Sequence, residues 1–86
     1  MHDLKPHPDI IETPLEGELV LLDPKTQQMY SLNATGVLIW ETLKSGQYAT
    51  VAEKLSNAFE VNPEQAQQDA DLLTADLERS GLLVRG

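Results

Sequence analysis

Hydrophobic and polar positions divide the chain near residue 33 into a strand-like part and a helix-like part. In the first part, short apolar runs alternate with turn residues, a pattern typical of β-strands. Glu16-Gly17 and Asp23-Pro24 are favourable turns between these runs. The runs therefore predict an antiparallel meander whose strands cover residues 10–15, 18–23 and 28–32.

In the second part, apolar residues recur at helical spacing. Asn33 and Asn62 are favourable N-caps, and Gly81 is a favourable residue for ending a helix. The expected helices cover residues 34–44, 51–59 and 63–80. The predicted fold class is therefore α+β: a three-stranded antiparallel β-meander followed by a three-helix bundle, with a winged helix-turn-helix-like order of helices.

The 86 residues allow one small domain. Residues 1–9 contain Pro6 and Pro8 and few apolar side chains, so we expect a flexible N-terminal tail followed by a domain over residues 10–86. On the third helix, Ala66, Ala70, Leu73 and Leu77 share one stripe that should face the core. The residues expected to lie in the core alone are Leu32, Trp40, Leu55, Phe59, Leu73 and Leu77.

The net charge of −8 excludes several classes of partner. Nucleic-acid binding depends on neutralising phosphates, and an anionic membrane would repel this chain. The sequence has no cysteine, no apolar signal segment and no apolar run long enough to span a membrane. We therefore expect a cytoplasmic protein that binds neither nucleic acid nor membrane.

Catalytic residues are not apparent in the sequence. The two histidines, His2 and His7, both lie in the expected tail, and no third metal ligand accompanies them at a defined spacing. There is also no phosphate-binding glycine loop, no dinucleotide fingerprint and no calcium loop. We therefore expect a protein that is not an enzyme and needs no cofactor or metal.

Leu72 lies roughly 100° away from the core stripe of the third helix, close to Gln65, Asp69 and Asp76. Scattered surface leucines are common in folded proteins, so one interpretation gives Leu72 no role. The other interpretation is that this face of the helix lines a groove for a partner. The pattern alone leaves both interpretations open.

The order of these motifs resembles the PqqD family, which includes recognition elements for ribosomally made precursor peptides. The similar stretch begins with an apolar strand, an Asp-Pro turn and Tyr-Ser-Leu-Asn, followed by Thr-Gly and Ile-Trp pairs in the sequence LVLLDPKTQQMYSLNATGVLIWETL. Residues 50–55 and 76–83 resemble the family's second helix and closing stretch. The pyrroloquinoline-quinone branch usually has a Pro-Glu-Gly turn where residues 23–26 read DPKT, so the resemblance favours the family over that pathway.

The resemblance implies a non-catalytic module that binds the leader of a precursor peptide and presents it to a modifying enzyme, such as a radical SAM protein or a leader peptidase. The leader would add as a strand to the third strand, which a meander leaves as a free edge, and would lie against the third helix. The implied binding residues are Gln28, Met29, Tyr30, Ser31, Gln65, Asp69, Leu72 and Asp76.

Two further expectations concern the same strand. Tyr30 has two interpretations: a core residue whose hydroxyl reaches the surface, or a residue that contacts the ligand. The first is at least as well supported as the second. A free strand edge can also pair with a second copy, so weak homodimerisation is expected. The alternative function is a winged-helix protein-interaction or regulatory domain without a leader-peptide ligand.

Overall fold

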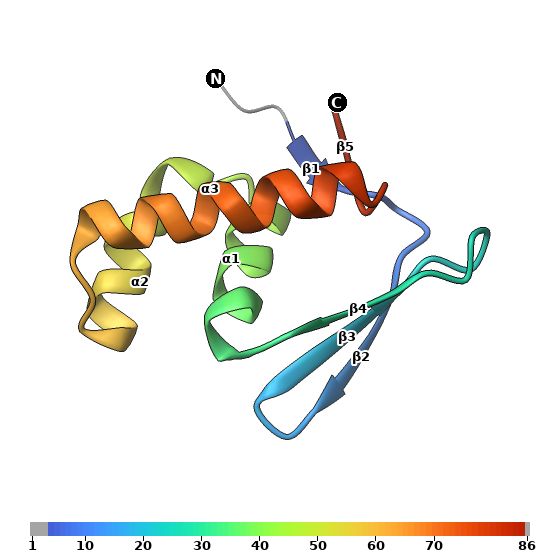
Figure 1. Cartoon of the computed structure of the whole chain (residues 1–86), viewed down its shortest axis with the longest axis horizontal. Helices are drawn as coiled ribbons and strands as arrows, with labels where there is room; N and C mark the ends of the chain where they lie inside the picture. Colours follow the sequence, from blue (N-terminus) through green and yellow to red (C-terminus); the bar gives the residue numbers. More distant parts are fainter. Residues whose placement is uncertain (1–3, 86) are drawn as a thin grey trace.

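A three-stranded antiparallel sheet precedes the helices in the computed structural model, which describes residues 4–85 of the chain. The strands β2 (Ile11–Leu15), β3 (Glu18–Leu22) and β4 (Met29–Leu32) lie in the order β2-β3-β4 (Figure 1). The predicted α+β fold class is confirmed, and the predicted third strand is β4. Because β3 occupies the middle, β4 has a free edge among the described residues.

The sheet buries one face and exposes the other. Successive side chains of a strand point to opposite faces, so each strand contributes to both. The inner face packs against the helices and is formed by Leu19, Leu21, Tyr30 and Leu32. The outer face carries the alternate residues, and none of the helices in residues 4–85 covers it (Figure 1). Met29 and Ser31 alternate with Tyr30 and Leu32 and therefore lie on the outer face.

Three helices follow the sheet: α1 (Ala34–Lys44), α2 (Val51–Phe59) and α3 (Pro63–Arg79). The Asn33 side chain accepts the Gly36 N–H at 2.9 Å and the Asn62 side chain accepts the Glu64 N–H at 2.8 Å, so both predicted N-caps are present. A short 3₁₀ turn, Tyr48–Thr50, leads into α2. No helix within residues 4–85 is long and apolar enough to cross a membrane.

The core lies between the helices and the inner face of the sheet. Trp40, Leu55 and Leu77 are buried there as predicted. Phe59 is not, and that prediction is wrong: its side chain is 38% exposed. Phe59 is the last residue of α2 and precedes Glu60 in the left-handed conformation (φ 54°), so the chain turns away and leaves the ring at the helix end.

Two additional strands join the ends of the described chain. β1 (Leu4–Pro6) pairs antiparallel with β5 (Leu83–Arg85), and Leu4 is buried in the core. The sequence predicted a flexible tail over residues 1–9, but its Leu4–Pro6 segment is held in a sheet. A strand of three residues is too short to show a recognisable alternation of apolar and polar residues, so the sequence alone does not reveal it. His2 lies outside the described residues.

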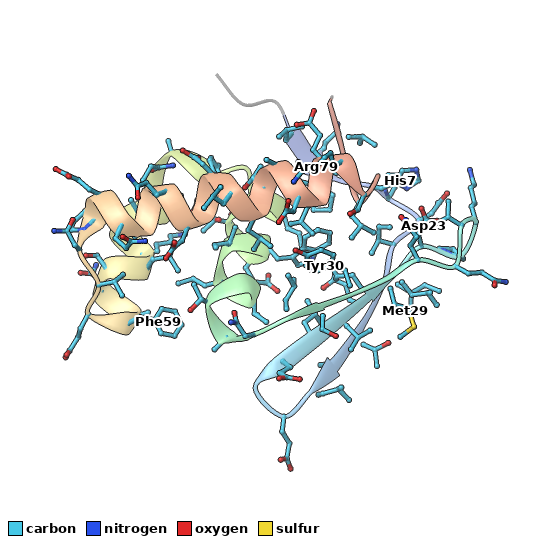
Figure 2. All side chains as sticks on the ribbon, viewed as in Figure 1. His7, Asp23, Met29, Tyr30, Phe59 and Arg79 are labelled. Atoms are coloured by element: carbon cyan, nitrogen blue, oxygen red, sulfur yellow. The ribbon has the colours of Figure 1, made fainter. Side chains whose placement is uncertain are left out.

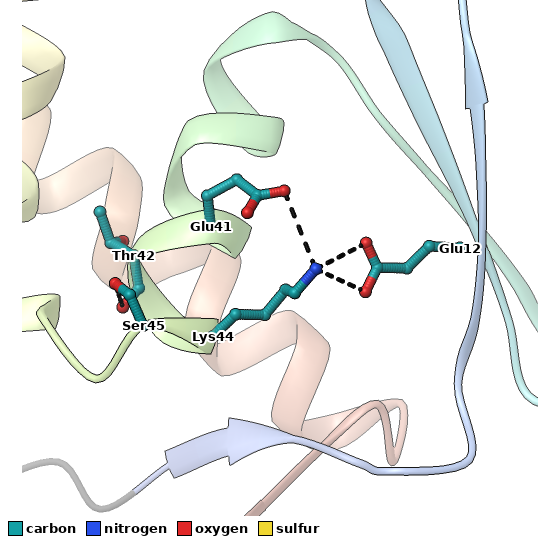
Figure 3. A network of polar contacts seen from close by, with 5 residues as sticks. All are labelled: Glu12, Glu41, Thr42, Lys44 and Ser45. Carbon is teal, nitrogen blue, oxygen red and sulfur yellow. Dashed lines mark hydrogen bonds and ion pairs between the residues drawn. The ribbon is translucent and has the colours of Figure 1, made fainter.

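An ion pair fixes β2 to α1 (Figure 3). The Lys44 ammonium lies 3.0 Å from one Glu12 carboxylate oxygen and 3.1 Å from the other, and 4.0 Å from Glu41. The hydrogen bond with Glu12 is the main cause that raises the pKa of Lys44. Because Glu12 points towards the helix, its neighbours Ile11 and Thr13 point to the outer face of the sheet.

Candidate functional site

A groove of about 500 Å³ runs between the β4 edge and α3. The first turn of α1 contributes to its lining, since the chain passes directly from β4 through Asn33 into that helix. The residues that line the groove are Glu18, Tyr30, Ser31, Leu32, Asn33, Thr35, Gly36, Ile39, Asp69 and Leu73. The groove therefore lies where the family resemblance placed a binding site.

Gly36 sets how closely α1 approaches β4. A Cβ at this position would lie 3.1 Å from Cδ2 and 3.2 Å from Cβ of Leu32, which is tighter than ordinary packing. Gly36 also donates its N–H to the Asn33 cap, so the helix start and the strand end are held together. This explains a glycine inside a helix, where it otherwise lowers helix stability.

The free edge of β4 presents unpaired main-chain groups at Met29 and Ser31. The Gln28 carbonyl accepts the Asp23 N–H at 3.0 Å, so it points towards β3. Peptide groups alternate in direction along an antiparallel strand, so those of Tyr30 and Leu32 also face β3. The N–H and C=O groups of Met29 and Ser31 therefore face away from β3, where no described strand pairs with them.

Tyr30 stands between β4 and α3 (Figure 2). It is partly buried against the core, and it also lines the groove, so both interpretations made from the sequence apply to it. Burial is the main cause that raises the pKa of its phenol, the Asp76 carboxylate raises it further, and the Arg79 guanidinium opposes them. Asp76 and Arg79 form an ion pair on the last turns of α3.

The α3 side of the groove is formed by Asp69 and Leu73. The Gln65 amide donates to the Asp69 carboxylate at 3.0 Å, which places Gln65 one turn further along the same rim. Leu72 does not line the groove and is 67% exposed. The sequence assigned Leu73 to the core alone, but this side chain packs against the core and lines the groove as well.

The remaining predicted residues lie around the same strand. Ser31 borders the groove at the free strand edge, although its side chain shares the outer face of the sheet with Met29. Met29 points away from α3 (Figure 2). Gln28 is exposed just before β4, and its N–H bonds to the Thr26 hydroxyl at 3.3 Å. Groove residues that the sequence did not indicate are Glu18, Leu32, Asn33, Thr35, Gly36, Ile39 and Leu73.

The groove is acidic. Glu18 and Asp69 line it, Asp76 lies close enough to affect Tyr30, and no lysine or arginine is among the described lining residues. In residues 4–85 there is no group of three histidine, aspartate or glutamate side chains placed to hold a metal ion. The His7 ring nitrogen Nδ1 accepts the Asp9 N–H at 3.1 Å.

These features define a class of protein: a small α+β domain with an open strand edge that faces a helix across a groove. Such an edge can accept a further strand through its main-chain groups. The chain belongs to the PqqD family, because the model for coenzyme PQQ synthesis protein D (PqqD) matches residues 18–83. The family indicated by the sequence motifs is thereby confirmed.

Two solved structures have the same fold. Lasso peptide synthetase B1 complexed with the leader peptide is 29% identical, with a TM-score of 0.86 over 95% of this chain and 98% of that chain. TbiB1 in complex with the TbiA(beta) leader peptide is 22% identical, with a TM-score of 0.83 over 92% of this chain and 93% of that chain. A comparison with curated proteins found no match.

Proposed function

We propose that this protein binds the leader segment of a ribosomally made precursor peptide as a strand added to β4. The observation that carries the proposal is the free β4 edge facing α3 across a groove. Family membership and two similar proteins solved with leader peptides support it. The module has no chemistry of its own and presents the peptide to a modifying enzyme, either a radical SAM protein or a leader peptidase.

The edge geometry determines how such a peptide would lie. Main-chain bonds would form with the outward groups of Met29 and Ser31, irrespective of the peptide sequence. Paired residues of neighbouring strands share a face, so peptide residues opposite Tyr30 and Leu32 would point into the groove. Two alternate peptide residues would therefore determine selectivity, and the residue between them would point to the outer face.

The groove lining indicates what those two side chains are. Leu32, Ile39 and Leu73 offer apolar contact, so one side chain is apolar and buried. Glu18 and Asp69 offer negative charge at the rim, which favours a lysine or arginine beside it. The ligand is thus a leader peptide in which an apolar residue and a basic residue lie two positions apart along the strand, or nearly so.

Nuclear magnetic resonance with the isotope-labelled protein tests this proposal. The ligand is the synthetic leader of a precursor peptide sought in the neighbouring reading frames. We expect amide shifts to concentrate at residues 28–32 and on the groove side of α3, around Asp69 and Leu73. Shifts confined to α2 would contradict strand addition and would favour the alternative, a winged-helix interaction domain without a leader ligand.

A matched set of peptides sharpens the test. N-methylation of a peptide residue removes its N–H. It should abolish leader binding when it is placed on either of the two peptide residues whose N–H groups meet the Met29 and Ser31 carbonyls. N-methylation of the residue between them removes an N–H that faces away from β4, so binding should persist. Equal effects at all three positions would contradict the proposed register.

The same edge accounts for the expected weak homodimer. A second copy of β4 could occupy the main-chain groups that the leader uses, so peptide and dimer should compete. Sedimentation should show any dimer dissociating when leader is added to saturation. A dimer that persists at saturating leader would mean that another surface holds the two copies together.

A further inference from the structure

The outer face of the sheet carries an apolar surface that the fold does not use. The strand registers place Ile11, Leu22 and Met29 in one row across the three strands, and Val20 lies in the next row. Leu15 extends this surface at the end of β2. We call these five residues the outer apolar surface. Ile11, Leu15 and Met29 are 47%, 55% and 70% exposed, although strands normally turn polar residues to an open face.

The size of this surface limits what it can hold alone. Three strands of up to five residues form a face of about 240 Å² at ordinary strand spacing and rise. A stable protein–protein interface covers about 800 Å² on each partner. The outer apolar surface is therefore too small for a stable dimer of this chain, and it is suited to a transient contact.

A bound peptide strand would enlarge this surface. The peptide residue between the two groove-facing residues lies opposite Ser31, and its side chain shares the outer face with Ser31. An occupant of the outer face would then contact both the protein and the bound peptide. The strand β4 belongs to both surfaces, which makes the outer face continuous with the proposed peptide site.

We propose that the enzyme that acts on the peptide docks on the outer apolar surface and on the outward side chains of the bound leader. This inference rests on the proposed function. Glu16 stands exposed next to Leu15 at the hairpin end of the surface, so the docking patch of the enzyme is apolar with a lysine or arginine at one end. The enzyme docks only when the leader is bound, because neither the outer face of the sheet nor the peptide alone offers enough contact area.

The variant Ile11→Thr/Leu15→Thr tests this proposal. Both residues lie on β2, the strand farthest from the peptide edge, and threonine keeps strand propensity. The matched control is Phe59→Gln, which removes an exposed apolar side chain from α2. The probes are the synthetic leader and the purified radical SAM protein or leader peptidase encoded beside the precursor.

We expect the double variant to bind leader within twofold of the unmodified protein but to bind the enzyme at least tenfold more weakly. The control should retain both affinities. The unmodified protein should bind the enzyme at least tenfold more tightly with leader than without. The assignment of this docking surface would be overturned if the double variant bound the enzyme as tightly as the unmodified protein. It would also be overturned if the unmodified protein did not bind the enzyme.

Other outcomes separate this inference from the function on which it rests. A double variant that turns a dimer into a monomer would overturn it by showing that a second copy occupies the face. If the unmodified protein binds no leader, the proposed function fails, and the docking surface fails with it. Normal leader binding with no enzyme effect of the double variant would reject only the docking surface.

Discussion

The two faces of the three-stranded sheet are built from alternate residues of the same strands, but their surroundings are opposite. Leu19, Leu21 and Leu32 on the inner face are buried beneath the helices. Ile11, Leu15 and Met29 on the outer face are large apolar residues in contact with solvent. The apolar composition of the two faces is thus similar, and only one of them contributes to the core.

This contrast shows that apolar character in a strand does not by itself indicate burial. The helices follow the sheet in the chain and return to one side of it, so one face is covered (Figure 1). The inner face then holds the domain together and, where it emerges beside α3, forms the groove. Ile11, Leu15 and Met29 stay exposed on the outer face and lie outside the core, and this is the reason to assign them a partner.

The largest difference between the faces should be in stability. Leu21→Ala removes a side chain with 0% exposure, so we expect the free energy of unfolding to fall by about 2–5 kcal/mol. Leu15→Ala on the outer face should change it by no more than about 0.5 kcal/mol. Urea unfolding followed by the fluorescence of Trp40, the single tryptophan, measures both. Equal losses would mean that the outer face is covered in solution.

A second comparison separates two neighbouring leucines of α3. Leu73→Ala removes an apolar wall of the groove, so leader affinity should fall by about 1–2 kcal/mol, or roughly 5- to 30-fold. Leu72→Ala should have a smaller effect, since Leu72 lies outside the groove lining. Isothermal titration with the leader measures both. A larger loss for Leu72 would place the bound peptide higher on α3 than the groove does.

A third and smaller effect should come from the ion pair that fixes β2 to α1 (Figure 3). Glu12→Gln removes a partly exposed pair with Lys44, so we expect a loss of about 0.5 kcal/mol that shrinks in 1 M salt. Glu41→Gln is the matched control, because Glu41 lies 4.0 Å from the same ammonium and should matter less. A greater loss from Glu41→Gln would show that β2 does not depend on this contact.

The smallest effect should be the pH dependence of Tyr30, whose side chain belongs to the inner face. Its pKa is raised, chiefly by burial, above the ordinary value of 10.0. The neutral phenol is therefore favoured in the folded state, and this contribution to stability is complete below pH 10 and lost as pH rises through the raised pKa. Absorbance titration of the two tyrosines should show both ionising above pH 10.

Tyr30→Phe should remove one of these two ionisation steps and leave that of Tyr48. The Tyr48 hydroxyl lies 2.7 Å from the Asp71 carboxylate and 3.2 Å from the Thr74 hydroxyl, so burial and Asp71 keep its pKa raised. The stability of Tyr30→Phe should decline less steeply above pH 10 than that of the unmodified protein. An ordinary phenol titration near pH 10 for Tyr30 would show that it faces solvent.

Local signals in the sequence were enough to predict most of the fold. Asn33 and Asn62 cap helices at the expected positions, and the side chain of Asp23 bonds back to the Lys25 N–H at 2.9 Å in the expected turn. These features depend on residues two or three apart in the chain. Phe59 was misassigned because burial at a helix end depends on where the chain turns next.

The candidate site was predicted only in part. Tyr30, Ser31 and Asp69 line the groove, and the sequence motifs indicated all three. Gly36 and its close neighbour Leu32 also line the groove, and the sequence identified neither as a groove residue. Met29 was among the implied binding residues, but its side chain lies on the outer face of the sheet, away from the groove (Figure 2).

The sequence by itself determined the elements, their order, the free edge of the meander and the family, because each depends on neighbouring residues or on motif order. Tertiary structure decided which face of the sheet the helices cover, which α3 leucine reaches the groove, and that β1 pairs with β5. The physical reason is that these features depend on contacts between residues far apart in the chain. Hydrophobic periodicity reports that a side chain favours burial, but only the packed fold determines what covers it.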